Sequence, residues 1–153
     1  MLELSTQAPD FTLPQSDGTE VTLSALRGGP VVLFFYPRDD TPGCTKESIA
    51  FSEGLAEFEA AGAKIFGISK DSVASHVKFS NKRNLTVPLL SDAQGSVCEY
   101  YGVWKEKNMY GKTYMGIERT TYLIDSAGNV ALVWPKVKVP GHAEAVLAAV
   151  KAL

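Results

Sequence analysis

The sequence feature that most constrains the fold is an unbroken apolar run of six residues, Val31 to Tyr36. The run is too short for a typical helix and is rich in β-branched and aromatic residues, so it predicts a strand buried on both faces of a sheet. Pro37 ends the run, and a polar loop over residues 38–43 leads into apolar residues at i, i+4 and i+7, a spacing that indicates a helix. These apolar residues are Phe51, Leu55 and Phe58.

The remaining segments alternate between strand and helix patterns. The predicted strands are 11–13, 21–23, 64–69, 120–124 and 130–134, and the predicted helices are 72–83, 93–101 and 143–153. In the helix 72–83, Val73 and Val77 are expected on the inner face, together with Phe79 or Ser80. This order predicts an α/β fold with a mixed central sheet flanked by helices. Because no repeat, low-complexity tract or linker divides the chain, residues 1–153 are expected to form a single domain.

Composition indicates which kinds of partner and substrate the protein can have. Apolar residues make up 45% of the chain and charged residues 21%, the balance of a globular protein with a packed core. The formal charge of -2 gives no broad positive field, so nucleic acids and anionic membrane surfaces are poor candidate partners. The first residues are acidic and no apolar run is long enough to span a membrane, which predicts a cytoplasmic protein that acts on small molecules.

The chain has two cysteines, Cys44 and Cys98, which form neither a CxxC pair nor a secreted disulfide framework. Cys44 follows the predicted central strand at the start of a helix, on the edge where open α/β sheets bind ligands. Free backbone N–H groups favour a thiolate there, and Pro42 and Gly43 let those amides approach a small substrate. The alternative is a buried structural cysteine, and the polar loop bounded by proline and glycine argues against it.

The same loop carries a family resemblance. Pro37, Thr41 and Cys44 match the peroxiredoxin pattern PxxxTxxC. Other segments are similar to the peroxiredoxin Q, or bacterioferritin comigratory protein, subfamily: YPRDDTPGCTKE, APDFTLPQSDG, VPLLSD, YGVW and ERTTYLID. The resemblance implies a thioredoxin-like fold and a thiol-dependent peroxidase in which Cys44 attacks hydrogen peroxide or an organic hydroperoxide. It also implies that Thr41 hydrogen-bonds the thiolate and the peroxide, that Pro37 shields the pocket from water, and that Arg119 activates both sulfur and peroxide.

Each of these residues also has a structural interpretation. Arg119 is always charged and offers fixed donors to sulfur and to a leaving oxygen, and its alternative is an ordinary surface charge. Thr41 alternatively fits a turn or helix-capping residue. Glu47 is expected to be a capping-box partner that holds the helix start. His76 is expected to be a solvated helix residue and His142 to lie at the start of the last helix, so neither is needed as a base or a metal ligand.

A sulfenic acid at Cys44 has to condense with another thiol before further oxidation inactivates it. The two positions at which peroxiredoxin Q chains usually carry a resolving cysteine hold Ile49 and Ser80. Cys98 has apolar and aromatic neighbours, so a buried structural role is favoured over a resolving role. The resemblance then implies a one-cysteine mechanism in a monomer, with thioredoxin, glutaredoxin or glutathione as the external reductant. No nucleotide-binding motif or metal-ligand cluster is present, so no cofactor and no metal are expected.

Two other functions remain open. In the first, a thioredoxin-fold binding module senses peroxide and forms mixed disulfides between Cys44 and partner proteins. The combination of Thr41, Cys44 and Arg119 argues against it, because a sensor needs oxidation but not repeated turnover. The second is a chaperone-like holdase, which needs an exposed apolar surface that the sequence does not identify.

Overall fold

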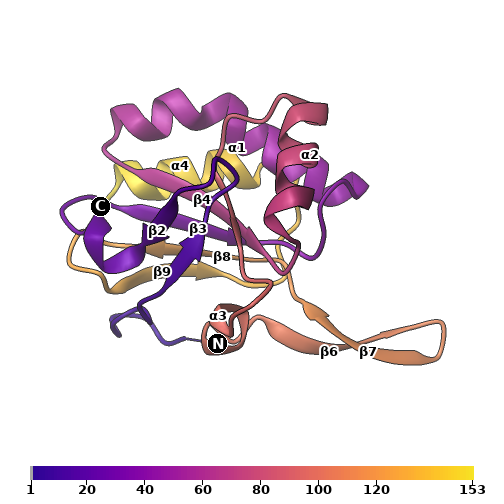
Figure 1. Cartoon of the computed structure of the whole chain (residues 1–153). Helices are drawn as coiled ribbons and strands as arrows, with labels where there is room; N and C mark the ends of the chain where they lie inside the picture. Colours follow the sequence, from indigo (N-terminus) through magenta and orange to yellow (C-terminus); the bar gives the residue numbers. More distant parts are fainter. Residues whose placement is uncertain (1) are drawn as a thin grey trace.

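A five-stranded mixed sheet forms the centre of the protein (Figure 1). The computed structural model describes residues 2–153. The strands lie in the order β5 (Leu89–Ser91), β4 (Lys64–Ser69), β3 (Val31–Phe35), β8 (Thr120–Ile124) and β9 (Val130–Trp134). β4 pairs in parallel with both β3 and β5, whereas β8 pairs antiparallel with both β3 and β9. The apolar run is therefore the central strand, as its composition predicts.

Side-chain alternation along β3 divides the core into two clusters. Successive residues of a strand point to opposite faces of the sheet. Val31, Leu33 and Phe35 accordingly belong to one apolar cluster, and Val32 and Phe34 belong to the other. Because every residue of β3 is buried, both faces of the sheet have to be covered by other parts of the chain.

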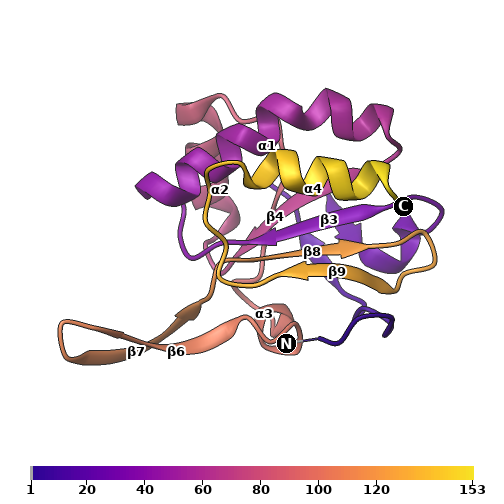
Figure 2. The same ribbon diagram turned by 180° about the vertical axis from the view of Figure 1, so that it is seen from behind.

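Three helices cover one face of the sheet: α1 (Pro42–Ala60), α2 (Val73–Arg83) and α4 (His142–Lys151) (Figures 1 and 2). The opposite face is covered by α3 (Val97–Tyr100) and by the N-terminal elements β1 (Thr12–Pro14), β2 (Glu20–Thr22) and the 3-10 helix η1 (Leu23–Leu26). The loops that follow β3 and β4 at their carboxyl ends lead into α1 and α2. This arrangement places the loop of residues 36–41 beside the start of α2.

A long hairpin of β6 (Trp104–Met109) and β7 (Lys112–Ile117) extends away from the body of the molecule (Figures 1 and 2). Tyr110 and Gly111 form its turn with φ angles of 53° and 77°, the two positive values that a type I′ hairpin requires. Trp104 and Ile117 at its base pack on the core, while Tyr110 at its tip is 97% exposed. The hairpin returns the chain to Arg119, which directly precedes β8.

The predicted α/β order with a mixed sheet is confirmed, and most predicted segments agree to within a few residues. The hairpin strands β6 and β7 and the short strand β5 are not predicted from the sequence. On α2 the inner position expected for Phe79 is confirmed, but Val77 is 37% exposed and His76 is buried instead. The expectation of a solvated His76 is therefore wrong, since both of its ring nitrogens are hydrogen-bonded inside the protein.

None of the helices within residues 2–153 combines the length and the apolar character that crossing a bilayer requires.

Candidate active site

Cys44 lies in the first turn of α1, at the carboxyl end of β3. Thr41 is the N-cap residue, with an extended backbone, and Pro42 opens the helix. Proline suits this first position because the N–H group that it lacks would have no intrahelical acceptor there. The other N–H groups of the first turn are free to donate to an anion or a bound oxygen. Cys44 itself is only 1% exposed, so its sulfur is shielded from bulk water.

Arg119 joins Cys44 to Glu47. Its Nη2 donates to Cys44 Sγ at 3.2 Å, and its Nη1 donates to Glu47 Oε1 at 2.7 Å. Cys44 and Glu47 lie three residues apart on α1 and therefore share one face of the helix. Gly43 leaves room for the arginine, since a Cβ atom at this position would stand 3.1 Å from Arg119 Nη2. One guanidinium group thus contacts the thiol and a carboxylate at the same time.

Burial governs the charges of this cluster. Desolvation raises the pKa of Glu47 to about 7, although Arg119 opposes the shift. Glu47 Oε2 is buried and has no hydrogen-bond partner within the described chain, which also disfavours the ionised form. Burial alone would lower the pKa of Arg119, but Glu47 and Cys44 together raise it above its ordinary value. Arg119 is therefore a permanent cation between two acidic groups.

Thr41 and Pro37 complete the loop in front of the helix. Thr41 Oγ1 donates to the carbonyl oxygen of Arg38 at 2.9 Å, and its side chain makes no capping bond to the helix. Thr41 thus takes the N-cap position that was its alternative interpretation. Its hydroxyl oxygen can still accept a hydrogen bond. Pro37 is half-buried at the beginning of this loop. The structure therefore brings Thr41, Cys44 and Arg119 into one region, with Pro42 and Gly43 between them in the chain.

The capping-box role expected for Glu47 is wrong. Thr41 is the N-cap residue, so the capping-box position N3 is occupied by Cys44, and Glu47 lies one turn further into the helix. Its carboxylate instead pairs with Arg119 in a partly buried ion pair. The spacing of three residues from Cys44 was the sequence signal that both side chains share one face. The partner on that face, Arg119, directly precedes β8, and no local pattern predicts this contact.

Cys98 lies on the other side of the sheet. Its side chain belongs to the cluster around Leu33 and Phe35, whereas Cys44 belongs to the cluster around Phe34. Cys98 is fully buried in α3, and burial raises the pKa of its thiol, with a further contribution from Asp92. Both cysteines are free thiols. The central sheet therefore separates the two sulfur atoms.

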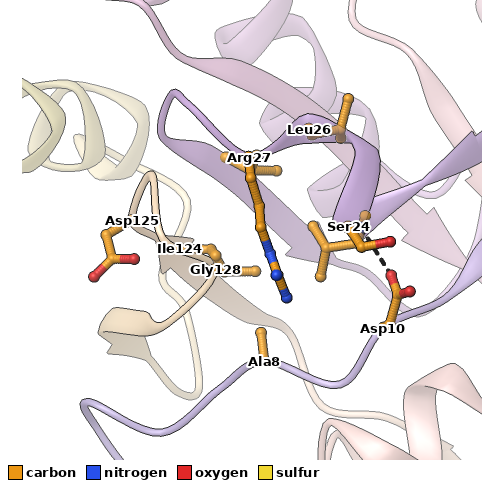
Figure 3. Close-up of a pocket in the computed structure, with 10 residues that line it drawn as sticks. Ala8, Asp10, Ser24, Leu26, Arg27, Ile124, Asp125 and Gly128 are labelled. Carbon is orange, nitrogen blue, oxygen red and sulfur yellow. Dashed lines mark hydrogen bonds between the residues drawn. The ribbon is translucent and has the colours of Figure 1, made fainter.

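A narrow cavity lies at the opposite, amino-terminal end of β3 (Figure 3). The side chain of Arg27 lies along it, with Gly128 on one side and Ser24 on the other. Gly128 has a φ of +90°, and a Cβ atom there would come within 2.8 Å of Arg27 Nε. The cavity has a volume of about 10 Å³, enough for about one water molecule. The cavity is therefore too small for an organic ligand.

Comparison with known proteins identifies the family. Residues 4–133 match the AhpC/TSA family. The chain belongs to this family, as a peroxiredoxin of the Bcp or Q group. Putative peroxiredoxin bcp of Coxiella burnetii is 52% identical over 141 residues, which cover 92% of this chain and 93% of the relative. Peroxiredoxin Bcp of Xanthomonas campestris pv. campestris is 51% identical over 152 residues, which cover 99% of this chain and 95% of the relative.

The fold is shared with solved structures of this group. The bacterioferritin comigratory protein of Xanthomonas campestris, solved as a trapped intermediate and ligand complex, superposes with a TM-score of 0.90 and 51% identity. The match covers 99% of this chain and 97% of the Xanthomonas chain. The thioredoxin-like fold and the peroxiredoxin family expected from the sequence are thereby confirmed. The chain is accordingly a thiol peroxidase by family.

Glu47 generates a prediction for the dependence of stability on pH. Because the pKa of Glu47 is about 7 in the folded protein and near 4.5 when unfolded, the unfolded chain ionises first as the pH rises. The free energy of unfolding should therefore fall between pH 4.5 and pH 7, by up to about 3 kcal/mol from this group. The variant Glu47→Gln lacks the titration. Urea denaturation at pH 5 and pH 8 should show a larger loss for the wild type than for Glu47→Gln, and equal losses would contradict the argument.

Proposed function

We propose that the protein reduces hydroperoxides with Cys44 as the attacking nucleophile. The observation that carries the proposal is the double contact of Arg119, which donates at once to Cys44 Sγ and to Glu47 Oε1. This fixed cation beside the sulfur lies where negative charge develops when a cysteine attacks peroxide. Free amides at the start of α1 can also donate to this charge.

In the first step the Cys44 thiolate attacks the hydroxyl oxygen of the hydroperoxide. A sulfur–oxygen bond forms while the oxygen–oxygen bond breaks, so the sulfur becomes a sulfenic acid. The other oxygen leaves as an alkoxide, or as hydroxide from hydrogen peroxide, and takes up a proton. Arg119 stabilises the charge that develops on this oxygen. Thr41 Oγ1, whose proton points to the Arg38 carbonyl, accepts a hydrogen bond from the peroxide O–H.

In the second step an external thiol attacks the sulfenic sulfur, which releases water and forms a mixed disulfide. A second thiol then reduces this disulfide and restores Cys44. Ile49 and Ser80 occupy the positions expected for a resolving cysteine, and Cys98 is buried beyond the sheet. These placements support thioredoxin, glutaredoxin or glutathione as the source of the reducing thiol.

The proposal also covers the class of substrate and the cellular location. The solved Xanthomonas relative is described for alkyl peroxide reduction, and we extend this substrate class to the present chain beside hydrogen peroxide. Two free thiols suit a reducing compartment, so the enzyme would serve antioxidant defence and redox homeostasis in the cytoplasm. The chain would act as one domain over residues 1–153.

The peroxidase proposal is tested by two substitutions at the site. Cys44→Ser keeps the size of the side chain but removes the acidic thiol, so peroxide turnover should be abolished while the fold is retained. Arg119→Met removes the charged donor and should slow oxidation of Cys44 by about a hundredfold or more. Stopped-flow mixing of the reduced protein with hydrogen peroxide measures the rate. Wild-type turnover in Cys44→Ser would refute the proposal, and an unchanged rate in Arg119→Met would remove Arg119 from the site.

A one-cysteine mechanism makes a separate prediction for Cys98. A disulfide requires Cα atoms within about 7 Å, and the two cysteines belong to clusters on opposite faces of the sheet. Cys98→Ser should therefore retain peroxide reduction with an external thiol. Non-reducing mass spectrometry after one equivalent of peroxide should show a sulfenic acid at Cys44. A peptide that links Cys44 to Cys98 would instead make Cys98 the resolving residue.

We also propose that the protein is a monomer. Its exposed large apolar side chains are distributed from the N-terminal segment to the C-terminus: Leu4, Val77, Tyr100, Met109, Tyr110, Tyr114, Met115, Leu132 and Leu153. On the hairpin, Tyr114 and Met115 are adjacent in β7 and so point to opposite faces. Light scattering at micromolar concentration should give the mass of a single chain, 16.5 kDa. A stable dimer at this concentration would show the expectation to be wrong.

A further inference from the structure

A buried polar cluster connects the loop before Cys44 to helix α2, and the peroxidase mechanism above does not use it. His76 is 0% exposed and Asp39 is 8% exposed. His76 Nδ1 lies 2.7 Å from Asp39 Oδ2, and Ser75 Oγ donates to the same oxygen at 2.8 Å. Tyr36 at the end of the central run donates its hydroxyl to Asp39 Oδ1 at 2.6 Å. Asp39 is thus held by residues of the central run and of α2.

The partners of His76 determine how the pair is protonated. Its Nε2 lies 2.9 Å from the carbonyl oxygen of Leu90, which can only accept, so Nε2 carries a proton. Its Nδ1 faces a carboxylate oxygen that already accepts from Ser75. A further proton must therefore lie between His76 and Asp39, in an ion pair or in its neutral equivalent. Removal of either residue leaves the other buried without its partner, which a folded protein tolerates poorly.

The loop has a second, exposed connection to the same helix. Asp40 has a φ of 57°, which is uncommon for a residue other than glycine, and it pairs with Lys82 and Arg83 of α2. These partners are exposed, and exposed ion pairs contribute little because water screens them and the side chains lose freedom. The backbone N–H of Asp39 also donates to Asp71 Oδ2 at 2.8 Å. The buried contacts of Asp39 are therefore the stronger connection.

Asp39 is placed where a small displacement would reach the reacting groups. It lies two residues after Pro37 and two residues before Thr41, and Cys44 follows within the next turn. The Arg38 carbonyl that accepts from Thr41 belongs to the residue adjacent to Asp39. A shift of Asp39 would therefore move both the Thr41 hydroxyl and the start of α1 relative to Arg119, which belongs to a separate segment directly before β8.

We propose that the Asp39–His76 pair is a positioning element that holds the Thr41 hydroxyl and the first turn of α1 in register with Arg119 for attack on peroxide. The proposal rests on the peroxidase function of Cys44. Neither Asp39 nor His76 touches the peroxide, and both act through the loop. Misplacement of reacting groups by about 1 Å can cost a hundredfold in rate, so the loss of this connection is expected in the oxidation step.

The test measures the second-order rate constant for Cys44 oxidation by hydrogen peroxide, through the change in tryptophan fluorescence in stopped flow. Asp39→Ala should lower this rate constant by about tenfold or more. Asp39→Asn offers an amide N–H to His76 Nδ1 and an oxygen to the Tyr36 hydroxyl, so it should stay within about threefold of wild type. Recovery by this conservative variant separates positioning from a need for the negative charge itself.

Two control variants lie near the Asp39–His76 pair but leave both of its residues unchanged. Asp40→Asn removes the exposed ion pairs of the adjacent residue, keeps a side chain that tolerates positive φ, and should leave the rate unchanged. Phe79→Leu weakens the apolar packing of α2, where the Phe79 ring lies 6.5 Å from that of Tyr36, and keeps the Asp39 and His76 side chains unchanged. It should lower the melting temperature but leave the oxidation rate near that of the wild type.

Each outcome decides the proposal. A folded Asp39→Ala variant that oxidises at the wild-type rate overturns it, as does an equal slowing in Phe79→Leu at a similar loss of melting temperature. If Asp39→Ala does not fold, His76→Gln replaces it, because glutamine cannot donate to both Asp39 and Leu90 at once. A rate at least about threefold below wild type then supports the proposal, and a wild-type rate overturns it. Slow oxidation of the wild type itself would instead refute the peroxidase function.

Discussion

The contact on which the site depends is a partly buried cation held between two acidic side chains. Arg119 donates to Cys44 Sγ and Glu47 Oε1 from two different nitrogens of one planar group. This contact requires α1 to present Cys44 and Glu47 on one face. It also requires β8 to begin where Arg119, the residue before it, can reach that face. Gly43 gives the guanidinium room, because a Cβ atom there would stand 3.1 Å from Arg119 Nη2. Helix, strand and loop are therefore all constrained by one side chain.

The two-sided sheet gives the two cysteines separate surroundings. Alternation along β3 assigns Cys44 and Cys98 to different cores, and each core is closed by its own helices. Cys44 lies at a helix start beside a cation, whereas burial and Asp92 raise the pKa of the Cys98 thiol. The two thiols thus lie in different surroundings, with a guanidinium beside Cys44 and a carboxylate beside Cys98.

Much of the fold can be predicted from the sequence, since β3, β4, α1, β8 and β9 have clear apolar periods. The hairpin of β6 and β7 cannot, because its strands are mostly solvated and carry little apolar alternation. The motif residues Thr41 and Cys44 are recognisable because they are close in sequence. The contacts of Glu47 and His76 are not, because Arg119 and Asp39 reach them across 72 and 37 residues of chain. Such partners are defined only once the sheet has brought distant segments together.

Charge in the site would also change as the proposed reaction proceeds. In the reduced enzyme Arg119 contacts both Cys44 Sγ and Glu47 Oε1, and burial raises the pKa of Glu47 to about 7. Under the proposed mechanism the sulfenic acid at Cys44 is neutral, which leaves Glu47 as the acidic partner of Arg119. The ion pair with Glu47 would then keep the guanidinium beside the sulfur while the reducing thiol approaches.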